Sequence, residues 1–281
     1  METIYIDSMR RYRKIVTTVY TRGRKRSPRG LATYDLGPTT ICIMNTSGGM
    51  PIGQGRNLNS AIGAVEAIQL IAGRADENLV LRVAPQFADY LDHGFFHGAY
   101  GRRIEKQLES VYFRLREDES TRQAVITLWN AKSDNIMGMR DYPCTVALGF
   151  DINDHGGLDM HVLMRSNDVW RGLPYDIFQF TQLQFTLARA LDRPVGMYEH
   201  TAWSLHLYES DLDAFEKMMD VPESDFRYDD VFQPRGVGRP GDNVGQIMLR
   251  ASMIMQGAEP IEATRDEVWY LEQLRRTSEL G

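Results

Sequence analysis

The sequence predicts an α/β (α+β) protein in which a mixed β-sheet is covered by long helices. Stretches with apolar residues at helical spacing dominate the first part of the chain, and short β-rich runs separated by turn residues dominate the middle. The chain has 281 residues, 43% of them hydrophobic, and contains neither an internal repeat nor a low-complexity linker. We therefore expect one domain spanning residues 1–281.

The first third of the chain is expected to contain two helices and one strand. Residues 2–20 are predicted to form a helix, and residues 22–38 a loop because of their prolines and glycines. The β-rich run 39–45 is predicted to be a strand. Apolar side chains recur at helical spacing over 59–72, and Gly73 follows where a helix would end.

The rest of the chain is expected to contain four strands and three helices. Residues 104–116 are predicted to form an amphipathic helix, and strands are predicted at 124–129, 144–152, 158–166 and 195–210. Residues 176–191 carry apolar side chains all round a helix, which predicts a buried one. Residues 262–276 are expected to form a surface helix.

Charge and cysteine content exclude several classes of protein. The net charge of −6 argues against general nucleic-acid binding, although residues 22–29 are locally basic. No run approaches the ~20 apolar residues of a membrane span. Cys42 and Cys144 lie far apart without a CxxC motif, which is typical of a reducing compartment, so we expect a cytoplasmic protein. His93 and His97 have no Glu between them, and we expect no metal.

Residues that follow Cys144 in the sequence indicate that it has a chemical role. A free cysteine is usually a small buried hydrophobe, an interpretation that we keep for Cys42. Arg165 stands at a predicted strand end, and a guanidinium can both grip a phosphate and lower the pKa of a nearby thiol. A surface ion pair is the alternative for Arg165. His206 and Tyr208 share one face of a strand, which suits a sugar hydroxyl or an edge-strand polar pair.

These residues stand in the order of the motifs of one family. The chain has PC at 143–144, RSND at 165–168, GLPYD at 172–176 and HLY at 206–208. It thereby resembles the thymidylate synthase family, whose pattern is PC, RSxD, GLPFN and HxY, over roughly residues 20–210. The resemblance implies that family's fold and a homodimer packed through the sheet. It also implies a pyrimidine nucleoside monophosphate as substrate and 5,10-methylenetetrahydrofolate as one-carbon donor.

The resemblance also implies roles for individual residues. Catalytic roles fall on Cys144, on Glu66 in AVEAIQLIAG, on Tyr100 in GAYG, and on Asp176. Nucleotide binding falls on Arg29, Arg122, Arg165, Ser166, Asp176, His206 and Tyr208. Arg122 would reach the phosphate site of the partner subunit, and the charges around Arg29 would be solvated. Folate contacts fall on Asp168, Gly172 and Tyr175.

The chemistry that the resemblance implies begins at Cys144. Its thiolate adds to C6 of the pyrimidine, helped by Arg165, and C5 then attacks the methylene of the folate. Glu66, through ordered water, and the nearby Tyr100 manage the protons and the loss of H5. Elimination of the folate leaves an exocyclic methylene. A thymidylate synthase reduces it with hydride, whereas a hydroxymethylase adds water.

Asp176 departs from the asparagine of thymidylate synthases. That amide donates to uracil O4 and accepts from N3–H. A carboxylate has no donor for O4, but it accepts from the exocyclic amine of cytosine and favours protonation at N3. The change resembles the deoxycytidylate hydroxymethylase branch; a helix cap is the alternative.

Other departures lie mainly in the segments that close over the folate in thymidylate synthases. Residues 83–91 replace a tryptophan-rich segment, Trp203–Ser204 replaces Gly-Asp, and the final RRTSELG is not an apolar tail. Residues 215–281 resemble no segment of the family. A less closed site admits water, which favours hydroxymethylation.

We therefore expect a homodimeric deoxycytidylate (dCMP) 5-hydroxymethylase. A CMP 5-hydroxymethylase is an alternative, although Ser166, which matches the deoxynucleotide enzymes, favours dCMP. A dUMP hydroxymethylase or a thymidylate synthase is a second alternative. A non-catalytic nucleotide- or RNA-binding relative is a third, against which the retained Cys144 argues because a binding protein needs no thiol. Neither a membrane nor a nucleic-acid partner is expected for the enzyme.

Overall fold

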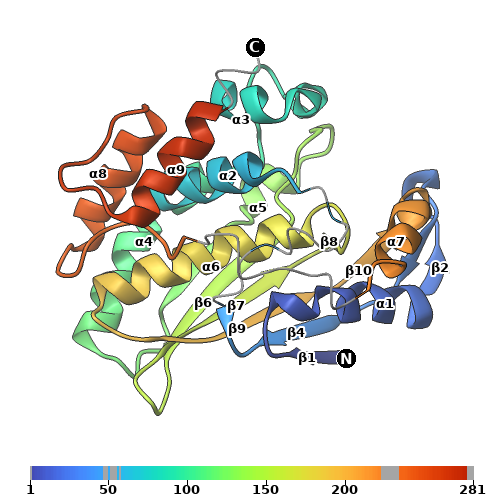
Figure 1. The fold of residues 1–281 in the computed structure, drawn as a ribbon, viewed down its shortest axis with the longest axis horizontal. Coiled ribbons are helices and arrows are strands. Elements are labelled where there is room, and N and C mark those ends of the chain that lie inside the picture. Colours follow the sequence, from blue (N-terminus) through green and yellow to red (C-terminus); the bar gives the residue numbers. More distant parts are fainter. Residues whose placement is uncertain (1, 47–49, 51–55, 57, 223–233, 277–281) are drawn as a thin grey trace.

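A mixed six-stranded sheet forms the centre of the molecule (Figure 1). The computed structural model describes residues 2–46, 50, 56, 58–222 and 234–276. The strands lie in the order β1 (Glu2–Ile6), β4 (Thr39–Ile43), β9 (Val195–Ala202), β7 (Leu158–Met164), β6 (Thr145–Ile152) and β5 (Val125–Thr127). β1 pairs with β4 and β7 with β9 in parallel, and the other neighbours are antiparallel. The predicted mixed sheet is confirmed.

A second sheet of four short strands lies beside the first. Its order is β2 (Arg24–Arg26), β3 (Thr33–Asp35), β10 (Leu205–Tyr208) and β8 (Asn167–Asp168). β8 follows β7 after two residues, and β10 follows β9 after two residues. The two sheets are therefore joined where β7 and β9 end.

Helices cover one face of the six-stranded sheet (Figure 1). α6 (Leu173–Ala190) packs on β7 and β9, and α2 (Ser60–Ala72) packs on α6. α4 (Tyr100–Glu117), α8 (Val244–Met255) and α9 (Arg265–Arg276) pack around α2. The remaining α-helices are α1 (Tyr12–Arg22), α3 (Glu77–Val83), α5 (Ala131–Asp134) and α7 (Leu212–Met219). Short 3-10 helices lie at Met9–Arg11, Pro28–Gly30, Pro85–Tyr90 and Glu209–Asp211.

The predicted helix over 59–72 is confirmed, and both of its ends have local causes. Asn59 caps α2 by accepting a hydrogen bond from the N–H of Ala61. Gly73 ends the helix with a left-handed φ of 64°, which a residue without a Cβ adopts at little cost. All residues of α2 except Ser60 and Glu66 are buried, so the helix passes through the core and carries Glu66 as a half-buried side chain.

Three secondary-structure predictions were wrong in part. Residues 2–6 form a strand rather than a helix, with Ile4 and Ile6 buried and Tyr5 exposed in the two-residue period of a strand. The predicted loop 22–38 contains β2 and β3. The predicted strand 195–210 divides at Trp203 into β9 and β10, which belong to different sheets.

The C-terminal helices are more buried than predicted. α9 was expected on the surface, but Tyr270, Leu271 and Leu274 are buried. Arg250 of α8 forms a buried ion pair with Glu267 of α9, with Nη2 and Oε2 2.6 Å apart. The pair joins α8 to α9 beside α2.

Across the part of the chain that the structure describes, no helix combines the length and the apolar composition needed to cross a bilayer.

Candidate active site

Cys144 and Arg165 lie side by side because of the β6–β7 pairing. Cys144 immediately precedes β6, Arg165 immediately follows β7, and the register places Thr145 opposite Met164. The N–H of Arg165 donates to the carbonyl of Cys144 at 2.8 Å. One guanidinium nitrogen lies 3.7 Å from the Cys144 Sγ. The sheet thus brings together two residues that are 21 positions apart in the sequence.

The Arg165 guanidinium also binds the two residues that precede Cys144 in the sequence. Its Nε donates to the carbonyl of Pro143 at 2.9 Å, and Nη2 donates to that of Tyr142 at 3.3 Å. Its carbon lies 5.8 Å from the ring centroid of Trp129. Burial raises the pKa of the Cys144 thiol, and Arg165 opposes this rise without cancelling it.

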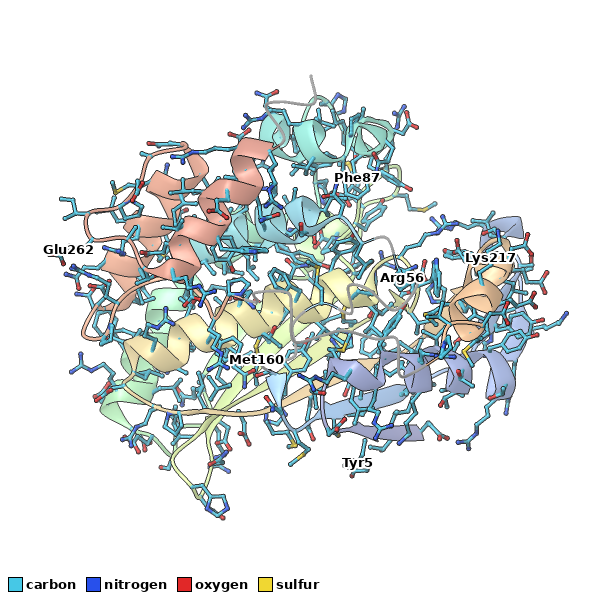
Figure 2. The ribbon with its side chains drawn as sticks, in the orientation of Figure 1. Tyr5, Arg56, Phe87, Met160, Lys217 and Glu262 are labelled. Carbon is cyan, nitrogen blue, oxygen red and sulfur yellow. The ribbon has the colours of Figure 1, made fainter. Side chains whose placement is uncertain are left out.

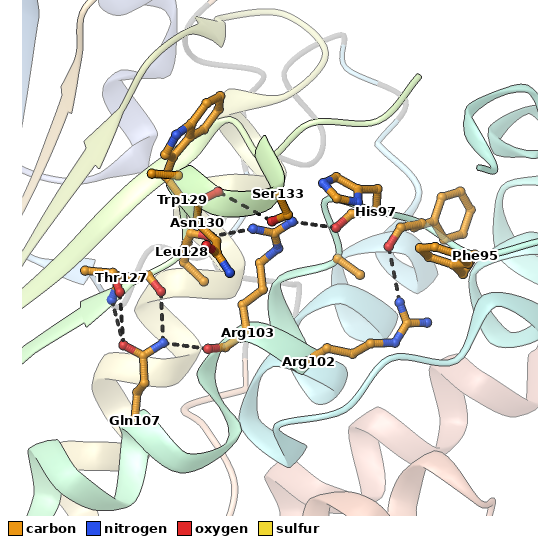
Figure 3. Close-up of a pocket in the computed structure, with 13 residues that line it drawn as sticks. Phe95, His97, Arg102, Arg103, Gln107, Thr127, Leu128, Trp129, Asn130 and Ser133 are labelled. Atoms are coloured by element: carbon orange, nitrogen blue, oxygen red, sulfur yellow. Dashed lines mark hydrogen bonds between the residues drawn. The ribbon is translucent and has the colours of Figure 1, made fainter. Parts of the chain in front are cut away.

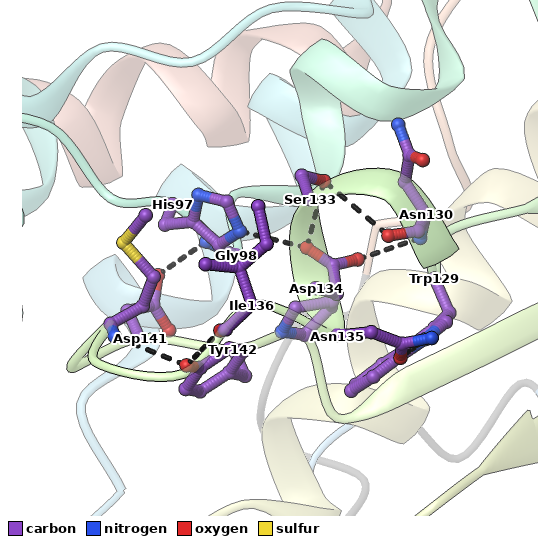
Figure 4. Close-up of polar contacts among 12 residues, drawn as sticks. His97, Gly98, Trp129, Asn130, Ser133, Asp134, Asn135, Ile136, Asp141 and Tyr142 are labelled. Carbon is purple, nitrogen blue, oxygen red and sulfur yellow. Dashed lines mark hydrogen bonds and ion pairs between the residues drawn. The ribbon is translucent and has the colours of Figure 1, made fainter.

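A buried aspartate fixes the loop that leads to Cys144 (Figure 4). Asp134 accepts from Arg103 at 2.6 Å and pairs with His97 at 2.7 Å. Burial opposes ionisation of Asp134, but hydrogen bonds from Arg103, Asn130 and His97 hold its pKa well below the usual range. Asp141 accepts from the N–H of Gly98 at 2.7 Å. The loop is thereby tied to the segment that opens α4.

A cavity of about 770 Å³ lies beside this cluster (Figure 3). Arg103, Gln107 and Trp129 line it, but none of the site residues predicted from the sequence does. Its polar groups pair with one another, since Arg103 binds Asp134 and the Gln107 Nε2 donates to the carbonyl of Thr127 at 2.9 Å. The polar lining of this cavity therefore supports the loop.

Tyr100 opens α4 and reaches toward Cys144. Its hydroxyl oxygen accepts from the N–H of Thr145 at 3.2 Å and from the Thr145 Oγ1 at 2.9 Å. Its ring stacks on Phe180 with centroids 5.8 Å apart. The next residue is Gly101, where a Cβ would lie 1.8 Å from the carbonyl oxygen of Arg74. Only glycine allows α4 to begin so close to the end of α2.

Two carboxyl groups with raised pKa values lie near Tyr100 and Cys144. Burial, and then the charge of Asp176, raises the pKa of Glu66 to about 8. Burial also raises the pKa of Asp176 to about 7, against the hydrogen bonds that it accepts. These come from Asn167 Nδ2 at 2.7 Å and Gln179 Nε2 at 3.2 Å. Glu66 Oε2 is buried without a hydrogen-bond partner among the described residues.

Asp176 does not cap its helix. α6 begins at Leu173 after Gly172, and the Asp176 side chain bonds to Asn167 and Gln179. Its charge also raises the pKa values of Tyr100 and Cys144, which shows that these side chains share one electrostatic environment.

The second sheet carries the residues assigned to the sugar. β10 pairs with β8 so that His206 lies opposite Asp168. The rings of His206 and Tyr208 meet edge to face with centroids 5.1 Å apart. Ser166 lies between β7 and β8, next to Arg165.

The residues assigned to folate lie around the start of α6. Asp168 Oδ1 accepts from the N–H groups of Trp170 and Arg171 at 2.8 and 3.2 Å. Tyr175 accepts from the N–H of Asn59 at 2.9 Å, which joins α6 to the start of α2. Gly172 leaves space beside Asn167 and Asp176, because a Cβ there would lie 3.3 Å from the Asn167 Nδ2.

Arg29 belongs to the site electrostatically. It is exposed at a left-handed φ of 55°, and its charge lowers the pKa of Cys144. Neighbours in the basic run were expected to be solvated, and they are exposed; each also forms an ion pair, Lys25 with Glu209 at 3.3 Å and Arg26 with Asp35 at 3.7 Å.

Arg122 is not brought to Cys144 within this chain. It is exposed and precedes β5, where Val125 pairs with Gly149 of β6. The antiparallel register places Arg122 level with the far end of β6, about 25 Å from Cys144 at ~3.3 Å per residue.

Several residues around the site were missed from the sequence. Asn167 fills the variable position of RSxD yet is buried and bonds to Asp176. His200 is buried on the core side of β9; a polar residue on an otherwise apolar strand face was the available signal. Arg56, which is labelled in Figure 2, stacks on Trp170 with its guanidinium carbon 3.8 Å from the ring centroid. Its Nε is buried without a partner among the residues described. No three His, Cys, Asp or Glu side chains in the described ranges converge as metal ligands would.

Comparison with known proteins confirms the resemblance to the family. A family model described as thymidylate synthase matches residues 10–226, more than half of the chain. A deoxyuridylate hydroxymethyltransferase of Bacillus phage SP01 is 31% identical over 221 residues, covering 72% of this chain and 57% of that protein. One of Pseudomonas phage M6 is 31% identical over 173 residues, covering 59% of this chain and 49% of that protein. The chain thus spans between about half and three-fifths of the length of these relatives. It belongs to the thymidylate synthase family.

Proposed function

We propose that this chain is a pyrimidine nucleotide C5 hydroxymethyltransferase that converts dCMP to 5-hydroxymethyl-dCMP. The observation that carries the choice of base is Asp176, a buried carboxyl whose two oxygens accept hydrogen bonds from Asn167 and Gln179. The family and the two hydroxymethyltransferases among its relatives support the reaction class.

Cys144 supplies the nucleophile for C6. Arg165 and Arg29 both favour its thiolate, although burial keeps the pKa of the free thiol raised. Bond formation between Sγ and C6 moves electrons toward C5 and N3. A proton shared between Asp176 and N3 neutralises the charge that develops there.

The site residues fit the folate of this family. When bound, 5,10-methylenetetrahydrofolate supplies the methylene group for C5. Asp168, Gly172 and Tyr175 are the residues assigned to hold it. Asp168 Oδ1 is occupied by two backbone N–H groups, and its Oδ2 receives no hydrogen bond from the described residues, so it can accept one from a ligand.

Glu66 is suited to proton transfer. With a pKa of about 8 it carries a proton at neutral pH and can return to the protonated form after giving one up. Once it has given up its proton, the Glu66 carboxylate can accept H5 through an ordered water held at its unpartnered Oε2, and such a water can also add to the exocyclic methylene. Tyr100, whose oxygen already accepts two hydrogen bonds from Thr145, has its own proton free to orient that water.

Asp176 favours cytosine because the base can take up the proton that it shares with Asp176, whereas uracil cannot. The carboxylate accepts from the exocyclic amine of cytosine, and cytosine N3 can take the proton that lies between the base and the other oxygen. Uracil O4 is far less basic, so the proton must stay on Asp176. An ionised Asp176 therefore rejects uracil.

A dUMP hydroxymethyltransferase is the second candidate, and the names of the two phage relatives favour it. Because the pKa of Asp176 is about 7, a substantial fraction of this group is protonated near neutral pH. A protonated carboxyl can donate to uracil O4 while accepting from N3–H. The two candidates thus differ in the protonation state of Asp176: it is ionised when cytosine is chosen and protonated when uracil is chosen.

The cover of the site supports hydroxymethyl rather than methyl transfer. The segment 83–91 has Phe87, labelled in Figure 2, and Tyr90 in place of tryptophans. Their rings are in edge contact with centroids 6.1 Å apart. Tyr90 is 53% exposed, and a site that is less closed to water would favour addition of water to the exocyclic methylene. Ser166, His206 and Tyr208 are assigned to the sugar, with CMP as the alternative substrate.

A second copy of the chain is proposed to complete the phosphate site with Arg122. Helices cover one face of the six-stranded sheet. Tyr5 and Val125 alternate with buried residues in β1 and β5, which places them on the other face, and they are 64% and 47% exposed. Packing two such faces together would bury them and bring the partner's Arg122 to the site.

The proposal predicts which nucleotide loses the hydrogen at C5. With methylenetetrahydrofolate and nucleotides tritiated at C5, we expect tritium release from dCMP in preference to CMP and dUMP, and a product that mass spectrometry identifies as the hydroxymethyl compound. Release from dUMP alone would establish the second candidate, and a methyl product would indicate a thymidylate synthase. No release from any of the three would support the binding-only alternative.

Asp176→Asn is expected to reverse the preference for the base. The amide donates to O4 without a titratable proton, so the dUMP:dCMP ratio of kcat/KM should rise by about 100-fold. Asp154→Asn, at an exposed turn, is the matched control for the loss of one carboxylate. An unchanged ratio in Asp176→Asn would show that this residue does not read the base.

Glu66→Gln is expected to stabilise the free protein while abolishing turnover. The pKa of Glu66 is raised from 4.5 to about 8, so its stability contribution is full below about pH 4.5 and is lost as pH rises through 8. The variant should gain roughly 2–4 kcal/mol in unfolding free energy at pH 8.5 and little at pH 4.5. Urea denaturation at both pH values measures this. Glu109→Gln, at an exposed position of α4, should show no such gain; an equal gain at both pH values in Glu66→Gln would contradict the account.

A further inference from the structure

A continuous chain of buried side chains leads from the interior of the sheet to Asp176. The Tyr198 hydroxyl lies 2.9 Å from His200 Nδ1, and His200 Nε2 lies 3.0 Å from Asn167 Oδ1. Asn167 Nδ2 lies 2.7 Å from Asp176 Oδ2. Tyr198 and His200 are fully buried and Asn167 is 4% exposed, so each link depends on the others for its hydrogen bonds.

The hydrogen bonds in this chain share one direction. Burial lowers the pKa of His200 to about 3, so its ring is neutral and carries one N–H. An ionised Asp176 requires a donor from Asn167, which turns the amide oxygen toward His200. His200 then donates from Nε2 and accepts the Tyr198 proton at Nδ1. Every bond points toward the carboxylate.

The opposite direction requires a proton on Asp176. Asp176 would then donate to the Asn167 oxygen, the amide would donate to His200 Nε2, and His200 Nδ1–H would donate to Tyr198. Asn167 therefore responds to the protonation state of Asp176. A residue at this position that cannot donate would remove a hydrogen bond that only the carboxylate form receives.

We propose that Asn167 is a positioning residue that determines the choice of base: it donates to Asp176, keeps that group an acceptor, and so favours cytosine over uracil. The inference deepens the proposed function and rests on it. Asn167 occupies the variable position of the RSxD motif, where the side chain is free to differ without loss of the neighbouring Arg165, Ser166 and Asp168.

Other ionisable groups also lie close enough to Asp176 to affect its charge. The side chains that face it or are coupled to it are Glu66 of α2, Tyr100 of α4, Cys144 before β6, Asp168 of β8, and Tyr198 and His200 of β9. All of these remain when Asn167 is replaced. A change in base preference on replacing Asn167 therefore reports on its hydrogen bond.

Asn167→Leu tests the proposal because leucine has a similar volume and no donor. We expect the dCMP:dUMP ratio of kcat/KM to fall by about 10-fold at pH 8, the value of one hydrogen bond to a charged group. The pH at which the ratio declines should also move upward, because the carboxylate is less stabilised. Tyr198→Phe should lower the ratio by about 3-fold through the same chain.

The double variant separates this role from simple packing. If Tyr198 acts through Asn167, adding Tyr198→Phe to Asn167→Leu should change the ratio no further. Equal losses for both nucleotides, or an additive effect of Tyr198→Phe, would overturn the proposal. Thermal melting identifies a variant that fails to fold, in which case Tyr198→Phe alone remains decisive: an unchanged ratio contradicts the inference.

Nucleotide binding distinguishes failure of the inference from failure of the proposed function. The dissociation constants of dCMP and dUMP, measured by calorimetry without folate, need no turnover. A wild-type protein that releases no tritium but whose dCMP:dUMP affinity ratio falls about 10-fold in Asn167→Leu refutes the catalytic proposal and retains the inference. An affinity ratio unchanged by the substitution refutes the inference, and binding of neither nucleotide refutes both.

Discussion

The burial of two carboxyl groups, Glu66 and Asp176, is the constraint on which the site depends. α2 and α6 pack together over the sheet and surround both carboxyl groups with protein atoms, and this burial raises their pKa values to about 8 and about 7. Each group therefore exchanges its proton in the physiological range. Glu66 can then act on water at C5, and Asp176 can distinguish bases by the position of one proton. The same burial lowers the stability of the free protein as the pH rises.

The C-terminal residues beyond the family match keep these helices in place. Gln182 of α6 accepts from the N–H of Gly236 at 2.8 Å and from the Tyr270 hydroxyl at 3.1 Å. Glu267 accepts from the N–H of Gly238 at 3.1 Å and is paired with Arg250. A buried ion pair adds little net stability, but it specifies one packing arrangement. We interpret residues 234–276 as a support for the helix that carries Glu66.

Local signals predicted most of the fold, and pairings between distant segments account for the errors. Asn59 and Gly73 mark the ends of α2 in the sequence itself. Residues 2–6 were read as helix because their strand character depends on pairing with β4, more than 30 residues away. The PC and RSND motifs predicted that Arg165 lies near the thiol of Cys144. Asn167 was missed because its role depends on the fold, which brings its side chain onto Asp176 and His200. The role of Arg122 at the partner's phosphate site is implied only by the family resemblance, and it stays a prediction because a single chain leaves Arg122 far from Cys144.

A covalent adduct on Cys144 tests the central claim most directly. In 5-fluoro-dCMP, fluorine replaces the hydrogen that must leave C5, so the bond between Sγ and C6 should persist once the methylene has been transferred. The protein would be incubated with this nucleotide and 5,10-methylenetetrahydrofolate, digested, and analysed by mass spectrometry. The account predicts an adduct on the peptide that contains Cys144, absent from Cys144→Ser and much weaker with 5-fluoro-dUMP at pH 8. An adduct on Cys42, or no adduct with either nucleotide, would contradict it.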